Sequence, residues 1–241
     1  MPAAIIVGAS TGIGRALAKE LAGRGYALGL VARREELLQQ LASELPGNPI
    51  IDVVDVTHLE ETTEKLNAIF QTLGTVDLFI YNSGIGRENP KLNLAPELDT
   101  IYVNVLGFAN AMNVAVKAME RQGRGHLAGI SSIASFRGGF IAPAYGASKA
   151  FMSNYLEALH FRMSRLSPSY AVTNVLPGYV DTPMTKSVRK MFWVATPEKA
   201  ARQIVNALVA KRRIVYVTRR WRLIAWLLKR MPTPVLAKIQ R

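Results

Sequence analysis

Residues 5–14 read Ile5-Ile6-Val7-Gly8-Ala9-Ser10-Thr11-Gly12-Ile13-Gly14. The apolar run predicts a short buried strand, and the helical spacing from Arg15 to Gly23 predicts a helix directly after the glycines. In such a turn the backbone amides can approach a pyrophosphate at the positive end of the helix, where a Cβ would block the approach. The stretch therefore predicts a dinucleotide site that includes Gly8, Ser10, Thr11, Gly12, Ile13 and Gly14.

The rest of the chain repeats this alternation of apolar runs and helices. Further apolar runs occupy residues 27–32, 50–54, 76–81, 126–131, 171–176 and 214–217. Helical segments at 35–45, 60–73, 96–121 and 145–166 separate most of them, and another helix begins near Pro197 with Thr196 as its N-cap. This pattern is typical of a parallel sheet covered on both faces. We expect one α/β domain over residues 1–241, with a doubly wound Rossmann sheet of about seven strands.

Composition excludes several classes of site. The chain has no cysteine, so disulfides, thiolate metal sites and a cysteine nucleophile are excluded. His58, His126 and His160 fall in different predicted elements without an acid at ligand spacing, so we expect no metal. The N-terminus lacks a secretory pattern and no apolar run reaches the roughly 18 residues of a spanning helix. We therefore expect a cytoplasmic protein.

The net charge of +13 is unevenly distributed. Residues 211–241 contain ten Lys and Arg and no acid, so only +3 belongs to residues 1–210. The basic tail carries no recognisable nucleic-acid-binding motif, and we expect no nucleic-acid partner. Its segment 219–241 is amphipathic, with two tryptophans between basic flanks. This segment could lie flat on an anionic membrane, or it could pack over a substrate cleft or against another subunit.

The glycine stretch also matches a rival pattern. Gly8 to Gly12 fits G-x-S-x-G, with Ser10 in the place of a hydrolase nucleophile. That enzyme class needs an oxyanion loop from an earlier strand, and only seven residues precede Gly8. We therefore favour the dinucleotide interpretation.

A second motif, Tyr145-Gly146-Ala147-Ser148-Lys149, begins the long predicted helix. The i, i+4 spacing puts the phenol and the ammonium on one helix face. A phenol has a reference pKa of about 10, and a nearby cation lowers it by favouring the phenolate. The pair predicts a proton transfer at Tyr145, and the alternative is an ordinary exposed helix pair.

The glycine spacing resembles that of the short-chain dehydrogenase/reductase family, and the resemblance extends from Ile5 to about Val217. It implies hydride transfer between a nicotinamide dinucleotide and a carbonyl or secondary alcohol. In that reaction Tyr145 moves the proton and Lys149 also holds the nicotinamide ribose. Ser132, 13 residues before Tyr145, would bind the substrate oxygen, with Ser131 the less favoured partner. Asn104 would anchor a water relay from the lysine to solvent.

Two arginines indicate which dinucleotide is bound. Arg33 and Arg34 lie 19 and 20 residues past Gly14, where NAD-preferring enzymes place an acid on the ribose 2′-hydroxyl. An acid there would repel a 2′-phosphate and arginine would bind it, so we expect NADP(H). The resemblance adds further cofactor contacts at Asp55, Val56, Asn82, Ser83, Gly84, Pro177, Gly178, Val180 and Thr182. Tyr81 and Ser83 depart from the Asn-Asn-Ala-Gly pattern of the family.

The sequence says less about the substrate than about the cofactor. The resemblance makes residues 183–195 a lid, and Met184 to Val194 with Phe136, Phe140 and Tyr179 offers mostly apolar lining. We expect a hydrophobic ketone, aldehyde or secondary alcohol. Basic residues near this lining leave an anionic substrate of the acyl-carrier type open: Arg137, Lys186 and Arg189.

Two expectations concern the whole chain. Family members usually pair through their long helices, so the resemblance implies a homodimer or homotetramer. An alternative of another class is a non-catalytic NADP(H)-binding sensor or scaffold of the same fold. The complete set of Asn104, Ser132, Tyr145 and Lys149 favours the enzyme.

Overall fold

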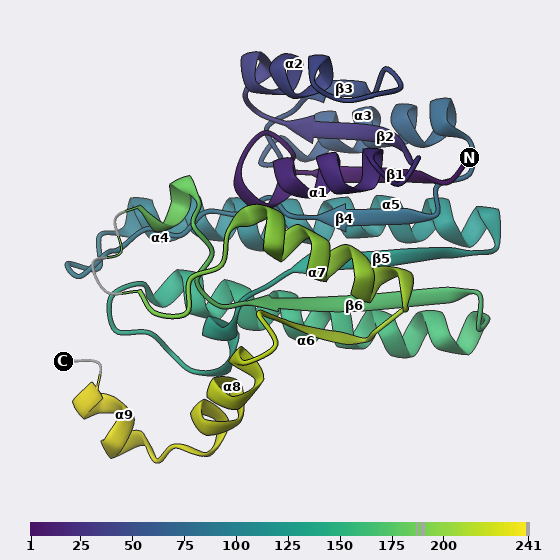
Figure 1. The fold of residues 1–241 in the computed structure, drawn as a ribbon. Helices are drawn as coiled ribbons and strands as arrows, with labels where there is room; N and C mark the ends of the chain where they lie inside the picture. Colours follow the sequence, from purple (N-terminus) through teal and green to yellow (C-terminus); the bar gives the residue numbers. More distant parts are fainter. Residues whose placement is uncertain (187, 189–190, 240–241) are drawn as a thin grey trace.

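A computed structural model of the chain describes residues 1–186, 188 and 191–239 and contains a twisted sheet with helices on both faces (Figure 1). The described strands pair in the order β3-β2-β1-β4-β5-β6-β7, and every pair is parallel. They are β1 (Ala3–Val7), β2 (Ala27–Ala32), β3 (Ile50–Val53), β4 (Leu78–Tyr81), β5 (Gly125–Ile130), β6 (Tyr170–Pro177) and β7 (Ile214–Val217). The expected doubly wound parallel sheet of about seven strands is confirmed.

The helices form two layers over this sheet. One layer contains α1 (Gly12–Ala22), α2 (Glu35–Ser43) and α7 (Pro197–Val209). The other contains α3 (Leu59–Leu73), α5 (Phe108–Gln122) and α6 (Pro143–Leu166), with α4 (Leu94–Ile101) packed on α6. Three short helical segments complete the body: η1 (Tyr102–Gly107), η2 (Ile133–Phe136) and η3 (Pro183–Thr185).

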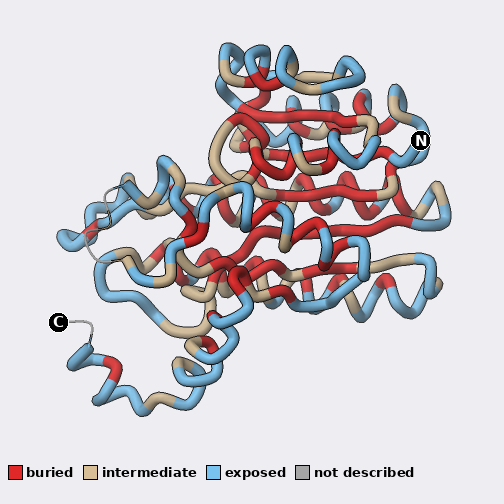
Figure 2. Tube along the Cα trace, in the orientation of Figure 1, coloured by how far each residue is buried: buried red, intermediate tan, exposed pale blue. Residues whose placement is uncertain are grey.

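Strand β1 shows why these strands read as apolar runs. Its five residues are all buried, because successive side chains point to opposite faces and both faces are covered. Ala4 and Ile6 pack against the α1 and α7 layer, whereas Ile5 and Val7 pack against the α3 and α5 layer. Figure 2 shows the same buried character along the central strands.

The carboxyl ends of β1 and β4 form the crevice of the fold. The chain leaves β1 for β2 and β3 on one side and returns to β4 on the other side, which creates a topological switch point. At this point the backbone amides of Asn82 and Ser83 donate to the carbonyl of Val7, 2.8 and 2.9 Å away. The segments after β1 and β4 therefore lie side by side at the mouth of the crevice.

The helix expected over residues 96–121 is interrupted. α4 leads into the π-helix η1, and α5 begins only at Phe108. π-helical turns are rare and occur mostly at functional sites, and this one carries Asn104. The long helix expected from Tyr145 begins two residues earlier, with Pro143 in the first helical position, where its missing amide costs nothing.

The tail forms two helices beyond β7, α8 (Trp221–Arg230) and α9 (Thr233–Ile239). Figure 1 shows them extending from the end of the sheet where β7 finishes. Within the described ranges no helix is long and apolar enough to cross a membrane.

Candidate functional site

A single cleft at the carboxyl ends of the strands collects most of the residues singled out in the sequence. It is lined by every expected dinucleotide contact except Gly14, together with Ser132, Tyr145 and Lys149. Its lining also includes Pro183, Met184 and Thr185 from the expected lid, and five residues that the sequence did not indicate: Ala32, Val54, Ile85, Val103 and Ile130. The cleft therefore joins the glycine-rich turn to the Tyr145 and Lys149 pair.

The glycine-rich turn is tightly packed against the segment after β4. Gly8 has a φ of +88°, and a Cβ on it would lie 2.5 Å from the backbone nitrogen of Ser83. Gly14 faces away from the cleft, because a Cβ there would lie 2.0 Å from the carbonyl oxygen of Gly8. Gly8 thus permits the turn itself, whereas Gly14 permits close packing of α1 on β1.

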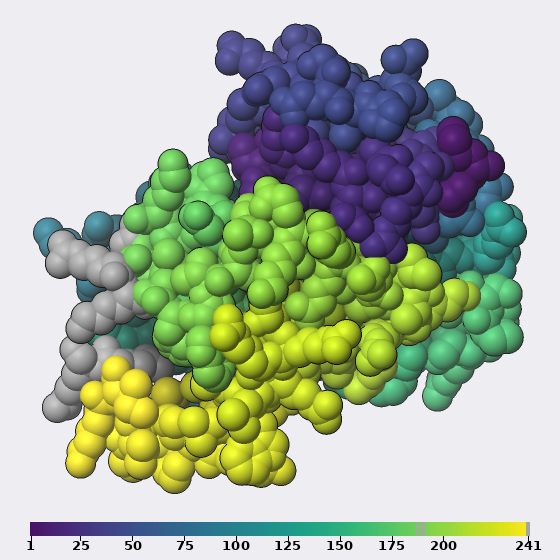
Figure 3. All heavy atoms as spheres, in the orientation of Figure 1, coloured from purple at the N-terminus to yellow at the C-terminus, as the bar shows by residue number. Residues whose placement is uncertain are grey.

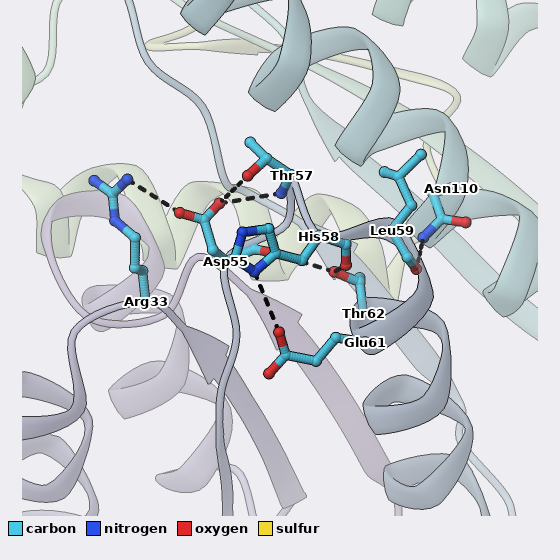
Figure 4. Close-up of polar contacts among 8 residues, drawn as sticks. All are labelled: Arg33, Asp55, Thr57, His58, Leu59, Glu61, Thr62 and Asn110. Atoms are coloured by element: carbon cyan, nitrogen blue, oxygen red, sulfur yellow. Dashed lines mark hydrogen bonds and ion pairs between the residues drawn. The ribbon is translucent and has the colours of Figure 1, made fainter.

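Two guanidinium groups border the end of the cleft after β2. Arg33 Nη1 lies 3.3 Å from Asp55 Oδ2, and the two side chains point toward one another in Figure 4. Arg34 Nη2 donates to the hydroxyls of Ser10 and Thr11 at 3.2 and 2.8 Å. Two cations and two hydroxyls therefore gather within one corner of the cleft.

Asp55 is held as a carboxylate by its surroundings. Partial burial raises its pKa, but hydrogen bonds from the amide and hydroxyl of Thr57 and from Arg33 outweigh burial, and the net shift of the pKa is downward. Figure 4 shows these bonds at the start of α3. Asp55 therefore orients Arg33 and also ties the turn after β3.

The segment after β4 contains the departures from the family pattern. Asn82 Nδ2 donates to the carbonyl of Gly8 at 2.7 Å and so holds the glycine-rich turn. The fully buried Tyr81 donates its hydroxyl to the carbonyl of Val103 at 2.8 Å. Burial raises the pKa of Tyr81, while a hydrogen bond with Ser83 acts in the opposite direction. The hydroxyl of Tyr81 thus joins the end of β4 to the π-helix η1.

Asn104 lies beneath the cleft and is fully buried. Its side chain accepts from the amide of Ile85 at 2.9 Å and donates to the carbonyl of the same residue at 2.8 Å. It also donates to Ser148 Oγ at 2.9 Å, and that hydroxyl donates to the carbonyl of Tyr145. Asn104 therefore connects the loop after β4 to the first turns of α6.

Ser132 and Tyr145 meet at the substrate side of the cleft. Ser132 caps η2, and its hydroxyl accepts from the amide of Ala134 at 3.1 Å. Burial raises the pKa of Tyr145, and a hydrogen bond with Ser132 acts in the opposite direction. Ser131 is occupied elsewhere, because its hydroxyl donates to the carbonyl of Lys149 at 2.8 Å. Ser132, the favoured serine, is thus the one beside Tyr145.

Lys149 is almost completely buried, with 4% of its surface exposed. Its ammonium donates to the carbonyl of Ile130 at 2.9 Å, and burial lowers its pKa to about 7. Nζ lies 5.8 Å from the centre of the Tyr145 ring. Burial raises the net pKa of Tyr145 in this structure, and the lowering by Lys149 that the sequence predicts stays a prediction. The ammonium is bonded to Ile130 and is itself destabilised by burial.

The loop after β6 closes the other side of the cleft. Val180 forms a bridge with Ala195, and the hydroxyl of Thr185 donates to the carbonyl of Val180 at 2.8 Å. A Cβ on Gly12 would lie 3.0 Å from Cγ2 of Thr182, so this loop approaches the glycine-rich turn. In the expected lid, Lys186 is exposed, whereas Arg189 lies outside the described residues.

The tail packs against the back of this loop. Trp221 is 1% exposed, and a Cβ on Gly178 would lie 2.0 Å from its indole ring. The ring centre of Trp221 is 4.9 Å from that of Phe192 and 5.6 Å from that of Tyr179. The tail thus adopts the packed arrangement beside the cleft, which was one of the alternatives for it.

The tail also covers part of the expected substrate lining. Lys229 Nζ lies 4.4 Å from the ring centre of Phe136. Arg137 donates to the carbonyl of Met231 at 2.9 Å and to Thr233 Oγ1 at 3.2 Å. Phe140 remains 68% exposed. Arg137, which had been considered for an anionic substrate, therefore binds the tail in this structure.

Three functional contacts were missed by sequence reasoning. Ser148 could have been noticed from its place between Tyr145 and Lys149. The bond from Tyr81 to Val103 had only one sequence signal, the departure of Tyr81 from the family pattern. The contact of Trp221 with Gly178 joins residues 43 positions apart and has no local signal.

Comparisons with known proteins agree with this geometry. The family model for short chain dehydrogenases matches residues 2–193. An uncharacterized oxidoreductase of Myxococcus xanthus is 36% identical over 187 residues, which cover 76% of this chain and 73% of that protein. The 3-oxoacyl acyl-carrier-protein reductase of Bos taurus is 30% identical over 187 residues, or 77% of this chain and 78% of that protein.

A solved structure supports the fold. A short chain dehydrogenase/reductase from Burkholderia phymatum, in complex with NAD, superposes with a TM-score of 0.86 over 96% of both chains at 20% identity. At that identity the likeness concerns the fold alone. Together with the match over residues 2–193, it shows that the chain belongs to the short-chain dehydrogenase family and is an oxidoreductase of that type.

Proposed function

We propose that the protein transfers a hydride between NADP(H) and a carbonyl or secondary alcohol, with Tyr145 as the proton-transferring residue. The observation that carries the proposal is the gathering of Ser132, Tyr145 and Lys149 at one end of the cleft that begins at the glycine-rich turn. A scaffold that only bound a dinucleotide would have no need for Ser132 and Tyr145 together beside Lys149 in this cleft.

The residues present fit a nicotinamide dinucleotide. Gly8 and Gly12 line the cleft at the start of α1, where the helix dipole favours a pyrophosphate. At the other end, Gly84 leaves space beside Lys149, since a Cβ there would lie 3.2 Å from Nζ. Backbone and hydroxyl groups of Val180 and Thr182 would hold the carboxamide.

The protein groups have separate roles in the proposed reaction. The bound nicotinamide supplies the hydride in reduction and accepts it in oxidation. Ser132 would donate a hydrogen bond to the substrate oxygen, and Tyr145 would protonate that oxygen in reduction. Burial raises the pKa of Tyr145, so the phenol is protonated before the transfer, as a proton donor must be.

Lys149 and Asn104 would support the proton transfer at Tyr145. A pKa of about 7 allows Lys149 to gain and lose a proton near neutral pH. Asn104 belongs to a π-helical turn, in which the backbone departs from ordinary helical bonding, and its side chain fixes the loop at Ile85. Asn104 is therefore a positioning residue, whose proposed role is to hold a path for protons between Lys149 and solvent.

The preference for NADP(H) rests on the corner made by Arg33, Arg34, Ser10 and Thr11. Two guanidinium groups and two hydroxyls supply donors for a 2′-phosphate, and charge-assisted bonds of this kind are the stronger class. Asp55, 3.3 Å from Nη1, neutralises part of the charge of Arg33, whereas the side chain of Arg34, among the described residues, bonds only to the two hydroxyls. We therefore expect a lower KM for NADPH than for NADH.

For the substrate we propose a neutral hydrophobic ketone or aldehyde. Arg137 is bonded to Met231 and Thr233 and is not available to an anionic group, while Met184 and Tyr179 present apolar surface at the cleft and beside it. The bovine relative acts on acyl-carrier substrates by name, so 3-oxoacyl thioesters form the competing substrate class.

One experiment tests the reaction and the substrate class together. NADPH oxidation is followed with a panel of lipophilic ketones, aldehydes and 3-oxoacyl thioesters, and the same panel is repeated with NADH. Turnover of the neutral carbonyls that Tyr145→Phe abolishes, with NADPH affinity retained, is the expected result. Tight NADPH binding without turnover of any carbonyl would favour a sensor, and near-normal turnover by Tyr145→Phe would exclude the mechanism.

A further inference from the structure

Helix α8 has two faces of different character. Trp221 and Ala225 point inward and are 1% exposed each. Leu223, Trp226 and Leu227 point outward and are 63, 52 and 44% exposed. Their i, i+3 and i+4 spacing makes a continuous apolar stripe along the outer face. Figure 3 shows the tail at the surface of the molecule, and the exposed fractions of the three side chains show that the stripe faces solvent in the single chain.

Basic residues flank the stripe at both ends. Arg219, Arg220 and Arg222 lie at its start and Arg230 lies at its end, whereas Lys229 lies on the inner side over Phe136. No ion pair joins any of the five to an acid in the part of the chain that the structure describes. The guanidinium of Arg230 lies 4.6 Å from the ring centre of Trp226, at the edge of the apolar stripe.

Helix α9 also exposes apolar residues. Pro232 separates it from α8, and its outward residues Val235 and Ile239 are 47 and 66% exposed at i, i+4 spacing. Only Leu236 of this helix is buried. The two helices therefore add apolar residues to a segment that has ten cations and no acid over residues 211–241.

The anchoring of α8 fixes this surface beside the mouth of the cleft. On its inner side Trp221 backs Gly178, and Lys229 covers Phe136 in the segment that follows Ser132. The tail is also bonded to Arg137 through Met231 and Thr233. The outer face of α8 is thus held in place by contacts on both sides of the site.

We propose that the outer face of α8 and α9 binds the surface of a membrane that contains anionic lipids. Leucine and tryptophan side chains on one face of a helix enter the boundary between headgroups and acyl chains, and arginines at its ends attract acidic headgroups. The surface has both features in one stripe. Membrane binding would place the mouth of the cleft next to a store of hydrophobic molecules.

The charge pattern disfavours two other occupants. A second copy of this face would bring two strongly basic segments together without an acid to pair with them. A nucleic acid would contact the arginines but leave Leu223, Trp226 and Leu227 uncovered. An anionic membrane surface has acidic headgroups above apolar chains, so it can contact both the arginines and the apolar side chains of the stripe.

The test uses the full chain and lipid vesicles without substrate. Sedimentation is measured with vesicles of neutral phosphatidylcholine and with vesicles that contain about 30 mol% phosphatidylserine, at about 0.1 and about 0.5 M salt. The expected result is stronger binding to the acidic vesicles by at least about tenfold, and loss of that preference at high salt.

Two double variants test the charged residues and the apolar residues of the stripe separately. Arg222→Gln with Arg230→Gln should weaken binding to acidic vesicles by roughly 25-fold, because each cation near such a surface contributes about a fivefold factor. Leu223→Ser with Trp226→Ser should weaken binding to both kinds of vesicle. The matched control, Arg165→Gln with Lys211→Gln, removes the same charge at the opposite end of the sheet and should bind as the parent does.

NADPH affinity and the thermal midpoint of each variant, measured without vesicles, establish that it is folded. Equal binding to neutral and acidic vesicles would overturn the proposal, and so would equal loss in the charge variant and its control. Failure of the parent to sediment with acidic vesicles, or a preference for duplex DNA over them, would also overturn it. Because no substrate is present, these outcomes are independent of the proposed reaction.

Discussion

Lys149 is a buried cation whose presence costs stability. Its pKa falls from 10.5 to about 7 on folding, so the unfolded chain binds more protons between these values. The stability of the fold therefore rises with pH from about 7 to about 10, and at neutral pH the buried ammonium costs up to roughly 4 kcal/mol. A buried charge that lowers stability is retained where it serves function, because it adds nothing to the structure alone.

The first prediction follows from this cost. Lys149→Met keeps the length of the side chain but removes the charge and leaves the carbonyl of Ile130 without its donor. We expect a net gain of roughly 1–3 kcal/mol at pH 7 in urea unfolding, no further rise in stability toward pH 10, and no turnover. A variant less stable than the parent at pH 7 would show that the ammonium is not destabilising.

Tyr81 provides a second prediction at the scale of one residue. Tyr81→Phe keeps the ring and its edge contact with Phe108 but removes the donor to the buried carbonyl of Val103. We expect a loss of about 1–2 kcal/mol in unfolding free energy, with a severalfold lower kcat, because Val103 precedes Asn104 in η1. Tyr155→Phe makes the same change on another ring beside Phe108 and serves as control. Equal effects of the two variants on kcat would contradict a positioning role for Tyr81.

Among the elements, the strands were predictable because both faces of the sheet are covered. Every strand then reads as an apolar run, and the run at 171–176 corresponds to β6 at Tyr170–Pro177. The π-helix η1 was not predictable, since its residues keep helical periodicity. It is held by bonds from Asn104 to Ile85 and from Tyr81 to Val103, which join residues about 20 positions apart in the chain.

The candidate site, like the elements, was predictable only where the signal is local in the sequence. Local spacing brought Tyr145 and Lys149 to one face of α6, and the glycine-rich turn placed the other end of the cleft. The direction of the Lys149 ammonium was not predictable, because its acceptor is the carbonyl of Ile130 at the end of β5, 19 positions earlier in the chain. Backbone acceptors and distant aromatic contacts leave no periodic signal in a sequence.

Helix α8 carries the third prediction. Trp221→Ala would leave a cavity behind Gly178 among Tyr179 and Phe192. We expect a loss of roughly 3–5 kcal/mol in unfolding free energy and a raised Kd for NADPH, because the loop at Gly178 loses its support. Trp226→Ala removes an equal side chain from the exposed face of the same helix and, without vesicles, should change the unfolding free energy by less than about 0.5 kcal/mol. If the two variants had the same Kd for NADPH, this result would contradict a role for α8 in supporting the cleft.

For the whole molecule, a buried histidine at the start of β5 makes stability depend on pH. His126 on β5 is 7% exposed, and its Nε2 lies 2.7 Å from Thr173 Oγ1 on β6. Burial, with a smaller contribution from Lys211, lowers the pKa of His126 to about 4. An unfolded histidine has a pKa of about 6.5, so the unfolded chain takes up the proton first as the pH falls. The unfolding free energy should therefore decrease as the pH falls from about 6.5 to about 4, by roughly 3 kcal/mol from this residue alone.

His126→Gln removes the titrating ring while leaving an amide that can bond to Thr173. We expect this variant to be less stable than the parent at pH 7 but to lose less stability between pH 6.5 and pH 4.5 in urea unfolding. His58→Gln is the control, since His58 lies on the surface beside Glu61 at the start of α3 (Figure 4). If the two variants lost stability with the same slope over this range, the acid sensitivity would have to come from carboxylates such as Asp55 and not from the sheet. A slope that flattens only in His126→Gln would show that one buried ring joining β5 to β6 sets the acid limit of the fold.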